Sequence, residues 1–533
     1  MPTLPGTNAN STSEHQDWRP SVNPWLPACS VMLATFMVVL DSSVANVALP
    51  HIAGTLSASN DESTWVLTSY LVANAIMLPV SVWLARRIGR SRLLLLSITL
   101  FTLASLLCGM SLSMPMLVVA RVLQGLGGGG MQPLAQSVLL ESFPPEQHGT
   151  AMAVYSVGVI VAPIIGPTLG GWITDSFSWR WIFYINLPFG LLALFMVNLY
   201  VEDPPYLRQR IRGAIDGVGL TLMVLWLGSL QLLLDKGQEA DWFGATWIRW
   251  ATAITVCSLI GFVLRELHTP NPIVHLRILT DRNFCLGTAI TAIYGFILYG
   301  ATAMLPLYLQ TLMGYSAMQS GMTVSPRGIG AMTSTILAGM LVRKIDGRLM
   351  ICFGFLVMAS SIWMLSLINL DIGMSSVIVP NMLNGFAMGF IFVPLTTLSL
   401  GLLPKSKIGN ASGIYNLMRN LGGSVGIAMI TTLLVRHTQV HQSDLAAASS
   451  GQSMFASTAG ALGRRIASSG VDPVTAQHKA WGMLYRSAQQ QASLLSYTDV
   501  FRLLALLSLL CIPMALAMRR GGAQAAKPEV ADK

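Results

Sequence analysis

The chain has 533 residues, of which 53% are hydrophobic and only 10% are charged. That is about 280 apolar residues, enough for about fourteen membrane spans of about 20 residues each. The charged share is far below the roughly 25% of an ordinary soluble domain. These numbers exclude a soluble globular protein and a disordered chain, and they exclude a transmembrane barrel, whose strands lack long apolar runs. The composition predicts an all-α polytopic membrane protein.

The formal net charge is +9, which we interpret as basic loops on the cytoplasmic side of a membrane. The six cysteines are scattered, and none has the spacing of metal ligands or an obvious disulfide partner. We therefore expect no metal site and no cofactor. Residues 1–26 are polar and contain no apolar core of a signal peptide, which predicts a cytoplasmic amino-terminal tail.

Apolar runs bounded by turn residues and charges predict fourteen membrane-spanning helices. In chain order we expect them at 27–48, 65–84, 92–112, 115–139, 150–173, 181–200, 214–234, 246–264, 284–308, 318–341, 350–369, 375–402, 410–434 and 499–518. Lysine and arginine gather in the loops after even-numbered helices, whereas the first loop has Asp61 and Glu62 but no basic residue. Both termini are therefore expected in the cytoplasm.

An internal repeat relates the two ends of the chain. The sequence Leu84–Ile88 reappears as Leu341–Ile345, and Leu123–Gly125 reappears as Leu383–Gly385. Further matches follow in the same order at a nearly constant offset of about 260 residues. Helices 1–6 and 9–14 are therefore predicted to form two related halves, with helices 7 and 8 inserted between them, as in a transporter with a central site.

This repeat divides the chain into five regions. We expect a tail at 1–26, a first six-helix half at 27–200, a linker with two inserted helices at 201–283, a second half at 284–518 and a tail at 519–533. The second half contains one long outer loop, 435–498, which is rich in Ala, Ser and Gln. That loop is too polar to span a membrane, and it is predicted to form a small helical lobe outside it.

Charged side chains inside the expected spans mark candidate functional positions. Asp41, in the stretch Leu40–Pro50, is the one carboxylate placed deep in a span, and a buried acid in lipid usually marks an ion or substrate path. Arg121, in Arg121–Gly127, lies at a similar depth in the fourth helix. An arginine beside a carboxylate favours its charged form. The two are expected to interact, either as a proton-coupling pair or as a fixed structural ion pair.

The fifth expected helix carries an unusual run of glycine and proline. Two prolines remove backbone donors and are expected to bend the helix, and glycines allow a neighbouring helix to approach closely. The run comprises Gly158, Pro163, Gly166, Pro167, Gly170 and Gly171. The glycines at 127–130 are also interpreted as close packing, because no Lys-Ser/Thr follows them as a phosphate-binding loop requires.

These motifs together resemble the fourteen-span drug:proton antiporter family of the major facilitator superfamily, and within it the EmrB-type exporters of Gram-negative bacteria. The resemblance covers about residues 25–520 and extends to the stretch Trp179–Gly190. It implies a major facilitator fold with two six-helix halves plus two inserted helices. It also implies that Asp41 and Arg121 couple protons, and that the glycine–proline run acts as a seal or hinge that favours exchange and export.

The resemblance further implies a substrate cavity between the halves. We expect its polar side chains to be Asn46, Gln124, Arg327, Asn416 and Arg419. Arg327 and Arg419 lie well inside the tenth and thirteenth expected helices, where an arginine usually faces a cavity. They equally fit a role in neutralising helix ends or snorkelling to the membrane surface.

One loop departs from the superfamily pattern Gly-x-Leu-Ala-Asp-Arg-x-Gly-Arg. Val82 replaces the glycine and Arg86 replaces the aspartate, whereas Arg87, Gly89 and Arg90 are retained. A latch made by the aspartate of this loop is therefore not expected here. The alternative interpretation is a basic loop that only sets the orientation of the chain.

The leading functional prediction is proton-coupled export of amphipathic drugs or toxic compounds across the inner membrane. The alternative is a dedicated exporter of one metabolite or siderophore. The resemblance implies two partners, a periplasmic, EmrA-like membrane fusion protein and an outer-membrane channel. We expect the loop 435–498 to dock the fusion protein. The alternative is that this loop is a self-contained cap on helices 13 and 14. One acid and up to three arginines in the spans favour neutral or weakly acidic substrates.

Two other classes of protein fit the sequence poorly. A membrane-embedded enzyme would need clustered histidines, carboxylates or cysteines near the spans, and the eight histidines are dispersed. A receptor without transport activity would not need a buried acid matched by an arginine. We therefore expect no enzymatic activity and no nucleic-acid partner.

Overall fold

The computed structural model describes most of the chain as helix. It covers residues 20–58, 60–203, 216–269, 272–315, 317–342, 344–370, 373–401, 403–450 and 453–519. The α-helices are α1 (Trp25–Thr55), α2 (Asn60–Ile88), α3 (Arg90–Gly109), α4 (Met114–Gly128), α5 (Met131–Ser142), α6 (His148–Ser176), α7 (Trp181–Tyr184), α8 (Asn186–Tyr200), α10 (Gly217–Lys236), α11 (Thr246–His268), α12 (Arg282–Thr311), α13 (Ala317–Val324), α14 (Pro326–Leu341), α15 (Gly347–Leu365), α16 (Ser375–Leu400), α17 (Lys405–Ser450), α18 (Ser453–Ala467) and α19 (Pro473–Leu516). Short 3-10 helices lie at Pro145–Gln147, Trp242–Gly244 and Leu276–Thr280.

Eleven stretches of the described chain are long and apolar enough to cross a membrane, and a bent helix, α6, makes twelve. The other two expected spans, 115–139 and 318–341, fall on pairs of shorter helices, α4 with α5 and α13 with α14. The all-α polytopic fold is confirmed, whereas the count of fourteen spans stays a prediction.

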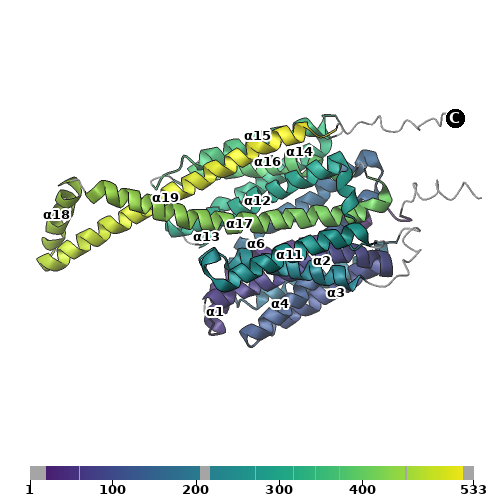
Figure 1. Cartoon of the computed structure of the whole chain (residues 1–533), viewed down its shortest axis with the longest axis horizontal. Coiled ribbons are helices and arrows are strands. Elements are labelled where there is room, and N and C mark those ends of the chain that lie inside the picture. Colours follow the sequence, from purple (N-terminus) through teal and green to yellow (C-terminus); the bar gives the residue numbers. More distant parts are fainter. Residues whose placement is uncertain are drawn as a thin grey trace, which may run out of the picture.

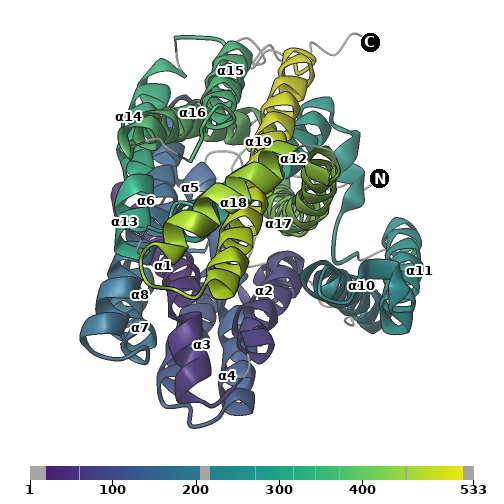
Figure 2. The same ribbon diagram turned by 90° about the vertical axis from the view of Figure 1, so that its left-hand side faces the viewer.

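The helices form two groups that lie side by side (Figure 2). In the first, α1 packs on α6 and α8, and α4 packs on α2 and α3. In the second, α12 packs on α17, α14 on α16, and α15 on α16 and α19. Helices α10 and α11 pair with each other at the edge of the bundle, where α10 contacts α2. The division of the chain into regions stays a prediction, but these pairings show which helices carry each site.

Glycines bring several of these helices into close backbone contact. A Cβ atom on Gly125 would lie 2.5 Å from the carbonyl oxygen of Tyr70, and one on Gly129 would collide with the backbone of Asn74. In the second group, Gly385 and Gly389 face the backbone of α14 in the same way. Gly129 belongs to the run 127–130, for which close packing is predicted, and it lies at such a contact.

Two long helices extend beyond the bundle as an arm. Helix α17 has 46 residues and α19 has 44, so each is about 65–70 Å long at 1.5 Å per residue, against a hydrocarbon layer of about 30 Å. Figure 1 shows them projecting together from one end, with α18 across the tip. We call residues 435–498 the arm. The expected helix bounds 410–434 and 499–518 were too short, because apolar residues mark only the part of a helix that lies in lipid.

Candidate functional site

The Asp41 and Arg121 side chains meet inside the first group of helices. Asp41 lies on α1 and Arg121 on α4, and Nη1 of Arg121 donates to Oδ2 of Asp41 at 2.7 Å. The residues are 2% and 0% exposed, respectively. The interaction expected from their similar depths is therefore present as a buried ion pair.

Two amides complete the shell around the Asp41 carboxylate. Nε2 of Gln124 and Nδ2 of Asn186 donate to its Oδ1 atom at 2.8 and 2.7 Å. Asn186 also donates to Oγ of Ser105 at 2.9 Å, and that hydroxyl donates to the carbonyl oxygen of Phe183. All of these partners of Asp41 are N–H donors, an arrangement that matches an ionised carboxylate, which only accepts hydrogen bonds.

The Arg121 guanidinium is held from the other side by α2 and aromatic rings. Its Nε atom donates to the carbonyl oxygen of Val66 at 2.9 Å. The guanidinium carbon lies 4.3 Å from the centre of the Tyr70 ring and 5.6 Å from that of Phe183, within the range of cation–π attraction. Removing two charges from water costs several kcal/mol per ion, and these contacts offset part of that cost.

The other residues expected in a substrate cavity occupy different places. Gln124 is fully buried in the Asp41 cluster. Arg327, on α14, donates from Nη1 to Oγ1 of Thr302 at 2.8 Å and is 5% exposed. Asn46 lies on α1, but its side chain is outside the described part of the structure.

Asn416 and Arg419 join the two helix groups. Nδ2 of Asn416 donates to Oε1 of Gln136 at 2.7 Å, and Nη2 of Arg419 donates to Oε1 of Gln132 at 2.6 Å. Both glutamines lie on α5 of the first group, whereas their partners lie on α17 of the second. These two predicted residues therefore lie at the boundary between the groups, where relative motion would break their contacts.

The glycine–proline run packs α6 against α1, the helix that carries Asp41. Cβ atoms on Gly158, Gly166 and Gly170 would lie close to Met32, Ser43 and Val44 of α1. The carbonyl oxygen of Pro163 accepts a hydrogen bond from Ser43 at 3.1 Å.

Helix α6 bends by 42° between its parts His148–Pro163 and Thr168–Ser176, as the prolines predict. Gly171 is half-buried, and the side chain of Pro167 lies outside the description. The bend therefore lies along the contact with the helix that carries Asp41.

The basic loop after α2 is tied down by carboxylates from elsewhere in the chain. Arg90 forms a two-pronged salt bridge with Glu141 at 2.9 Å for both contacts, and the pair is almost fully buried. Gly89 has φ of 95°, and the next two backbone N–H groups donate to Oδ1 of Asp203 at 2.8 Å. The loop lacks the aspartate of the superfamily pattern, and its basic residues are instead held by an acid on α5 and an acid after α8.

The two remaining arginines of this loop have separate partners. Arg87 lies over the Trp83 ring at 5.5 Å, and Nη1 of Arg86 lies 2.9 Å from Nε2 of His275. Burial and then the charge of Arg86 lower the pKa of His275 from its ordinary value. A neutral imidazole can accept the Arg86 hydrogen bond, so this contact joins α2 to the segment before α12.

Sequence reasoning missed four residues of these clusters. Asn186 and Ser105 contact Asp41 or its amides, whereas Glu141 and Asp203 hold the basic loop. A signal existed for Asn186, which stands within the family-like stretch Trp179–Gly190. Glu141 and Asp203 lie at or beyond helix ends, where an acid is ordinary and gives no such signal.

Comparison with known proteins identifies the fold and the family. The model of the Major Facilitator Superfamily matches residues 31–427, well over half of the chain. The chain belongs to the Major Facilitator Superfamily. That membership makes it a multi-pass membrane transporter rather than an enzyme.

Three curated bacterial relatives narrow the likeness to EmrB-type members. The chain is 43% identical over 425 residues to the probable multidrug resistance protein EmrY of Escherichia coli, covering 79% of this chain and 82% of the relative. It is 37% identical to the multidrug export protein EmrB of Escherichia coli, covering 89% and 91%. It is 36% identical to the fatty acid resistance protein FarB of Neisseria gonorrhoeae, covering 91% and 94%.

Solved structures of more distant members share the fold. The proton:xylose symporter XylE aligns with a TM-score of 0.59 at 15% identity, covering 91% of this chain and 94% of that one. The human organic anion transporter MFSD10 aligns with a TM-score of 0.58 at 14% identity, covering 92% and 100%. At these identities the likeness concerns the fold alone.

Proposed function

We propose that this protein exports amphipathic drugs or toxic compounds across the inner membrane in exchange for protons. The observation that carries the proposal is the Asp41 carboxylate, buried in a span and surrounded by Arg121, Gln124 and Asn186 as donors. An intramembrane acid of this kind is by default an ion path. The names of the relatives EmrB and EmrY support export of several drugs as the activity.

In the proposed mechanism, proton uptake and helix movement are one event. A proton on Asp41 would remove the negative charge that pairs with Arg121 and weaken the hydrogen bonds that the carboxylate now accepts. Arg121 has an alternative anchorage on the Val66 carbonyl and the Tyr70 ring, whereas Asp41 is carried by α1, which packs on the bent helix α6. Movement of α1 relative to α4 would therefore part the ion pair and open Asp41 to a proton.

The substrates are proposed to be neutral or weakly acidic amphiphiles. Arg327 and Arg419 are buried cations without a carboxylate partner among the described residues, and the buried acid Asp41 is already paired with Arg121. A weak acid would lower the cost of those cations. The name of the relative FarB, a fatty acid resistance protein, agrees with this class.

The orientation and partners are part of the same proposal. We propose that both termini lie in the cytoplasm, because the loops at the end opposite to the arm carry Arg86, Arg87, Arg90 and their neighbours. The arm then projects into the periplasm, where we propose that it docks a membrane fusion protein leading to an outer-membrane channel. Exposed apolar side chains such as Met483, Tyr485 and Trp481 on the arm support a docking role.

Everted membrane vesicles provide the test of proton-driven export. Vesicles that contain the chain should accumulate a fluorescent weak-acid amphiphile without ATP when a pH gradient with an acidic interior is imposed. An uncoupler should abolish this accumulation. Accumulation that needs ATP or resists the uncoupler would overturn the proposal. A dedicated metabolite exporter, the second candidate, predicts proton-driven uptake of one compound with no competition from unrelated amphiphiles.

A further inference from the structure

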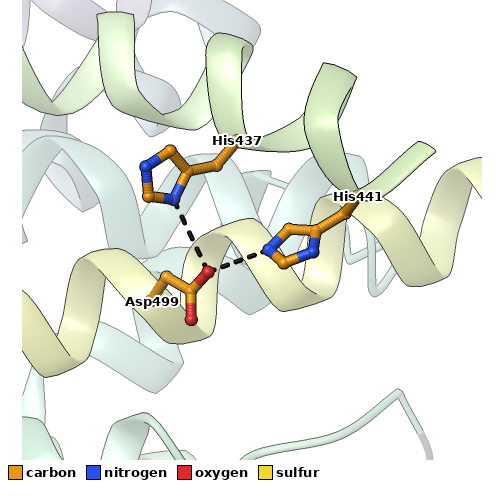
Figure 3. Close-up of side chains that lie close together, drawn as sticks. All are labelled: His437, His441 and Asp499. Carbon is orange, nitrogen blue, oxygen red and sulfur yellow. Dashed lines mark hydrogen bonds and ion pairs between the residues drawn. The ribbon is translucent and has the colours of Figure 1, made fainter. Parts of the chain in front are cut away.

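Two histidines and an aspartate from distant parts of the chain converge at the base of the arm. His437 and His441 are four residues apart on α17, so they share one face of that helix, and Asp499 lies opposite them on α19 (Figure 3). Oδ2 of Asp499 lies 2.8 Å from Nε2 of His441 and 3.5 Å from Nδ1 of His437. The three ligand atoms lie within 4.8 Å of one another.

Two further hydrogen bonds join α17 to α19 near this cluster. The buried hydroxyl of Ser496 donates to the carbonyl oxygen of Leu434 at 2.8 Å. Nε2 of Gln442 donates to the hydroxyl of Tyr485 at 2.9 Å. The three side chains therefore stand on a fixed backbone, which a metal site requires of its ligands.

We propose that His437, His441 and Asp499 bind a divalent transition metal ion, with Zn²⁺ as the best match to the ligand set. Zn²⁺ takes histidine nitrogen and carboxylate oxygen at about 2.0–2.2 Å with tetrahedral geometry, which places ligand atoms about 3.3 Å apart. The 2.8 and 3.5 Å separations here bracket that value. Three protein ligands leave a fourth position open to water, which fits the partly exposed side chains.

The charges around the cluster leave one carboxylate oxygen for the metal. Nη1 of Arg502 lies 3.8 Å from Oδ1 of Asp499, the oxygen that faces away from both histidines. The ion would bind the other oxygen, Oδ2, together with Nδ1 of His437 and Nε2 of His441. Each histidine would bind the ion as a neutral imidazole, through the ring nitrogen that faces Asp499.

A bound ion would fasten α17 to α19 at the point where both helices leave the bundle. Helix α17 also carries Asn416 and Arg419, which contact the first helix group. The metal would therefore fix the position of α19 relative to α17, the helix that lies at the boundary between the groups. Binding of the ion does not depend on which compound the protein transports.

The test uses the full chain, purified in detergent through a tag without histidine, stripped with a chelator and desalted. Zn²⁺ is titrated against a chromophoric chelator, and bound zinc is counted by mass spectrometry. The variants are His437→Gln, His441→Gln and Asp499→Asn, and the matched control is His478→Gln, an exposed histidine elsewhere on the arm. Gel filtration and metal-free thermal unfolding identify any variant that fails to fold, and the remaining variants then decide.

We expect one Zn²⁺ per chain in the wild type and in His478→Gln, with a visible absorption band of tetrahedral type when Co²⁺ replaces it. Loss of an outer-shell partner commonly weakens metal binding by about 10–100-fold, so loss of a direct ligand should weaken it by at least about tenfold. Zn²⁺ should also raise the unfolding temperature of the wild type but not of the three variants. Failure of the wild type to bind Zn²⁺, or equal binding by all variants, would overturn the proposal.

Discussion

Asp41 and Arg121 form an ion pair, and each of the two side chains also has further partners that hold it in place. The Asp41 carboxylate accepts hydrogen bonds from two amides, and Arg121 contacts a carbonyl oxygen and two aromatic rings. A buried charge whose partner is removed costs about 3–5 kcal/mol, whereas replacing both members often costs little. Transport and stability should therefore respond differently to single and paired substitutions.

Replacing the acid should stop transport. Asp41→Asn keeps the size of the side chain but removes the group that binds a proton, so proton-driven accumulation in everted vesicles should fall to the level of empty vesicles. Asp175→Asn is the matched control, because that carboxylate is 74% exposed at the far end of α6. Normal transport by Asp41→Asn at equal expression would show that another residue couples protons.

The free energy of unfolding should differ between the single variant at Arg121 and the double variant at Asp41 and Arg121. Arg121→Gln leaves Asp41 buried without its cation and should lower the free energy of unfolding by about 3–5 kcal/mol. The double variant Asp41→Asn with Arg121→Gln should recover most of that loss, since two neutral amides replace the pair, and it should remain inactive. Thermal unfolding of the three purified proteins measures this, and a double variant less stable than Arg121→Gln would contradict it.

Helices approach one another in this bundle wherever a glycine leaves room for a neighbouring backbone. Gly385 on α16 lies against the carbonyl group of Arg327 on α14, and Gly295 on α12 lies against that of Arg419 on α17. Both intramembrane arginines therefore sit where two helix backbones touch. Their depth and direction depend on these contacts as well as on their positions in the sequence.

A methyl group at such a contact should push two helices apart. Gly385→Ala is expected to cost about 1–3 kcal/mol, the usual penalty of overpacking, because the contacted atom belongs to the backbone. Gly482→Ala on α19 is the control: nothing lies within 4 Å of its added Cβ, and alanine favours a helix by about 0.5–1 kcal/mol over glycine. Changes in the unfolding temperature, relative to the wild type, that have the same size and sign in the two variants would exclude this account.

The arm should be needed in cells but not in vesicles. Replacing 440–490 with a short Gly/Ser linker leaves the expected spans 410–434 and 499–518 in place, so transport measured in everted vesicles should stay largely intact. Resistance of whole cells, and crosslinking to a membrane fusion protein, should disappear if the arm docks that partner. Survival of whole-cell resistance would mean that the arm is a self-contained cap and that docking occurs elsewhere.

At the scale of the whole molecule, the proposed exchange would require that the two helix groups rock against each other. Gln132 and Gln136 of α5 hold Arg419, Asn416 and Ser412 of α17 in the state seen here. These are hydrogen bonds rather than buried ion pairs, and each contributes only about 0.5–1.5 kcal/mol net, or somewhat more where a charge takes part. Contacts of this strength can hold a state and still be broken in each cycle.

The buried arginines of the spans should select substrates that are neutral or weakly acidic. A pump-deficient host that expresses this chain should gain resistance to neutral and weakly acidic amphiphiles, including uncouplers, and little resistance to quaternary ammonium compounds. Arg327→Gln should reduce resistance to the acids more than to the neutral compounds. The reverse profile, with cations exported well and acids not at all, would show that the buried arginines do not select the substrate.

The sequence by itself determined the class of fold, the approximate positions of the spans and the meeting of Asp41 with Arg121. Each of these follows from local properties, since the thickness of the bilayer sets the length of an apolar run and the distance of a residue from the end of that run sets its depth. Confinement to one depth in a small bundle made contact between two opposite charges the expected outcome.

Only the tertiary structure decided which distant side chains meet. Asn186 reaches Asp41, Glu141 reaches Arg90, and Asp499 reaches two histidines of α17 across segments whose packing no local pattern specifies. The arm was underestimated for a related reason: polar residues continue a helix as well as apolar ones do, so hydropathy shows where α17 and α19 leave the lipid but not where they end. Packing of one helix against the other, which depends on both partners at once, decided their length and the place of the clustered ligands.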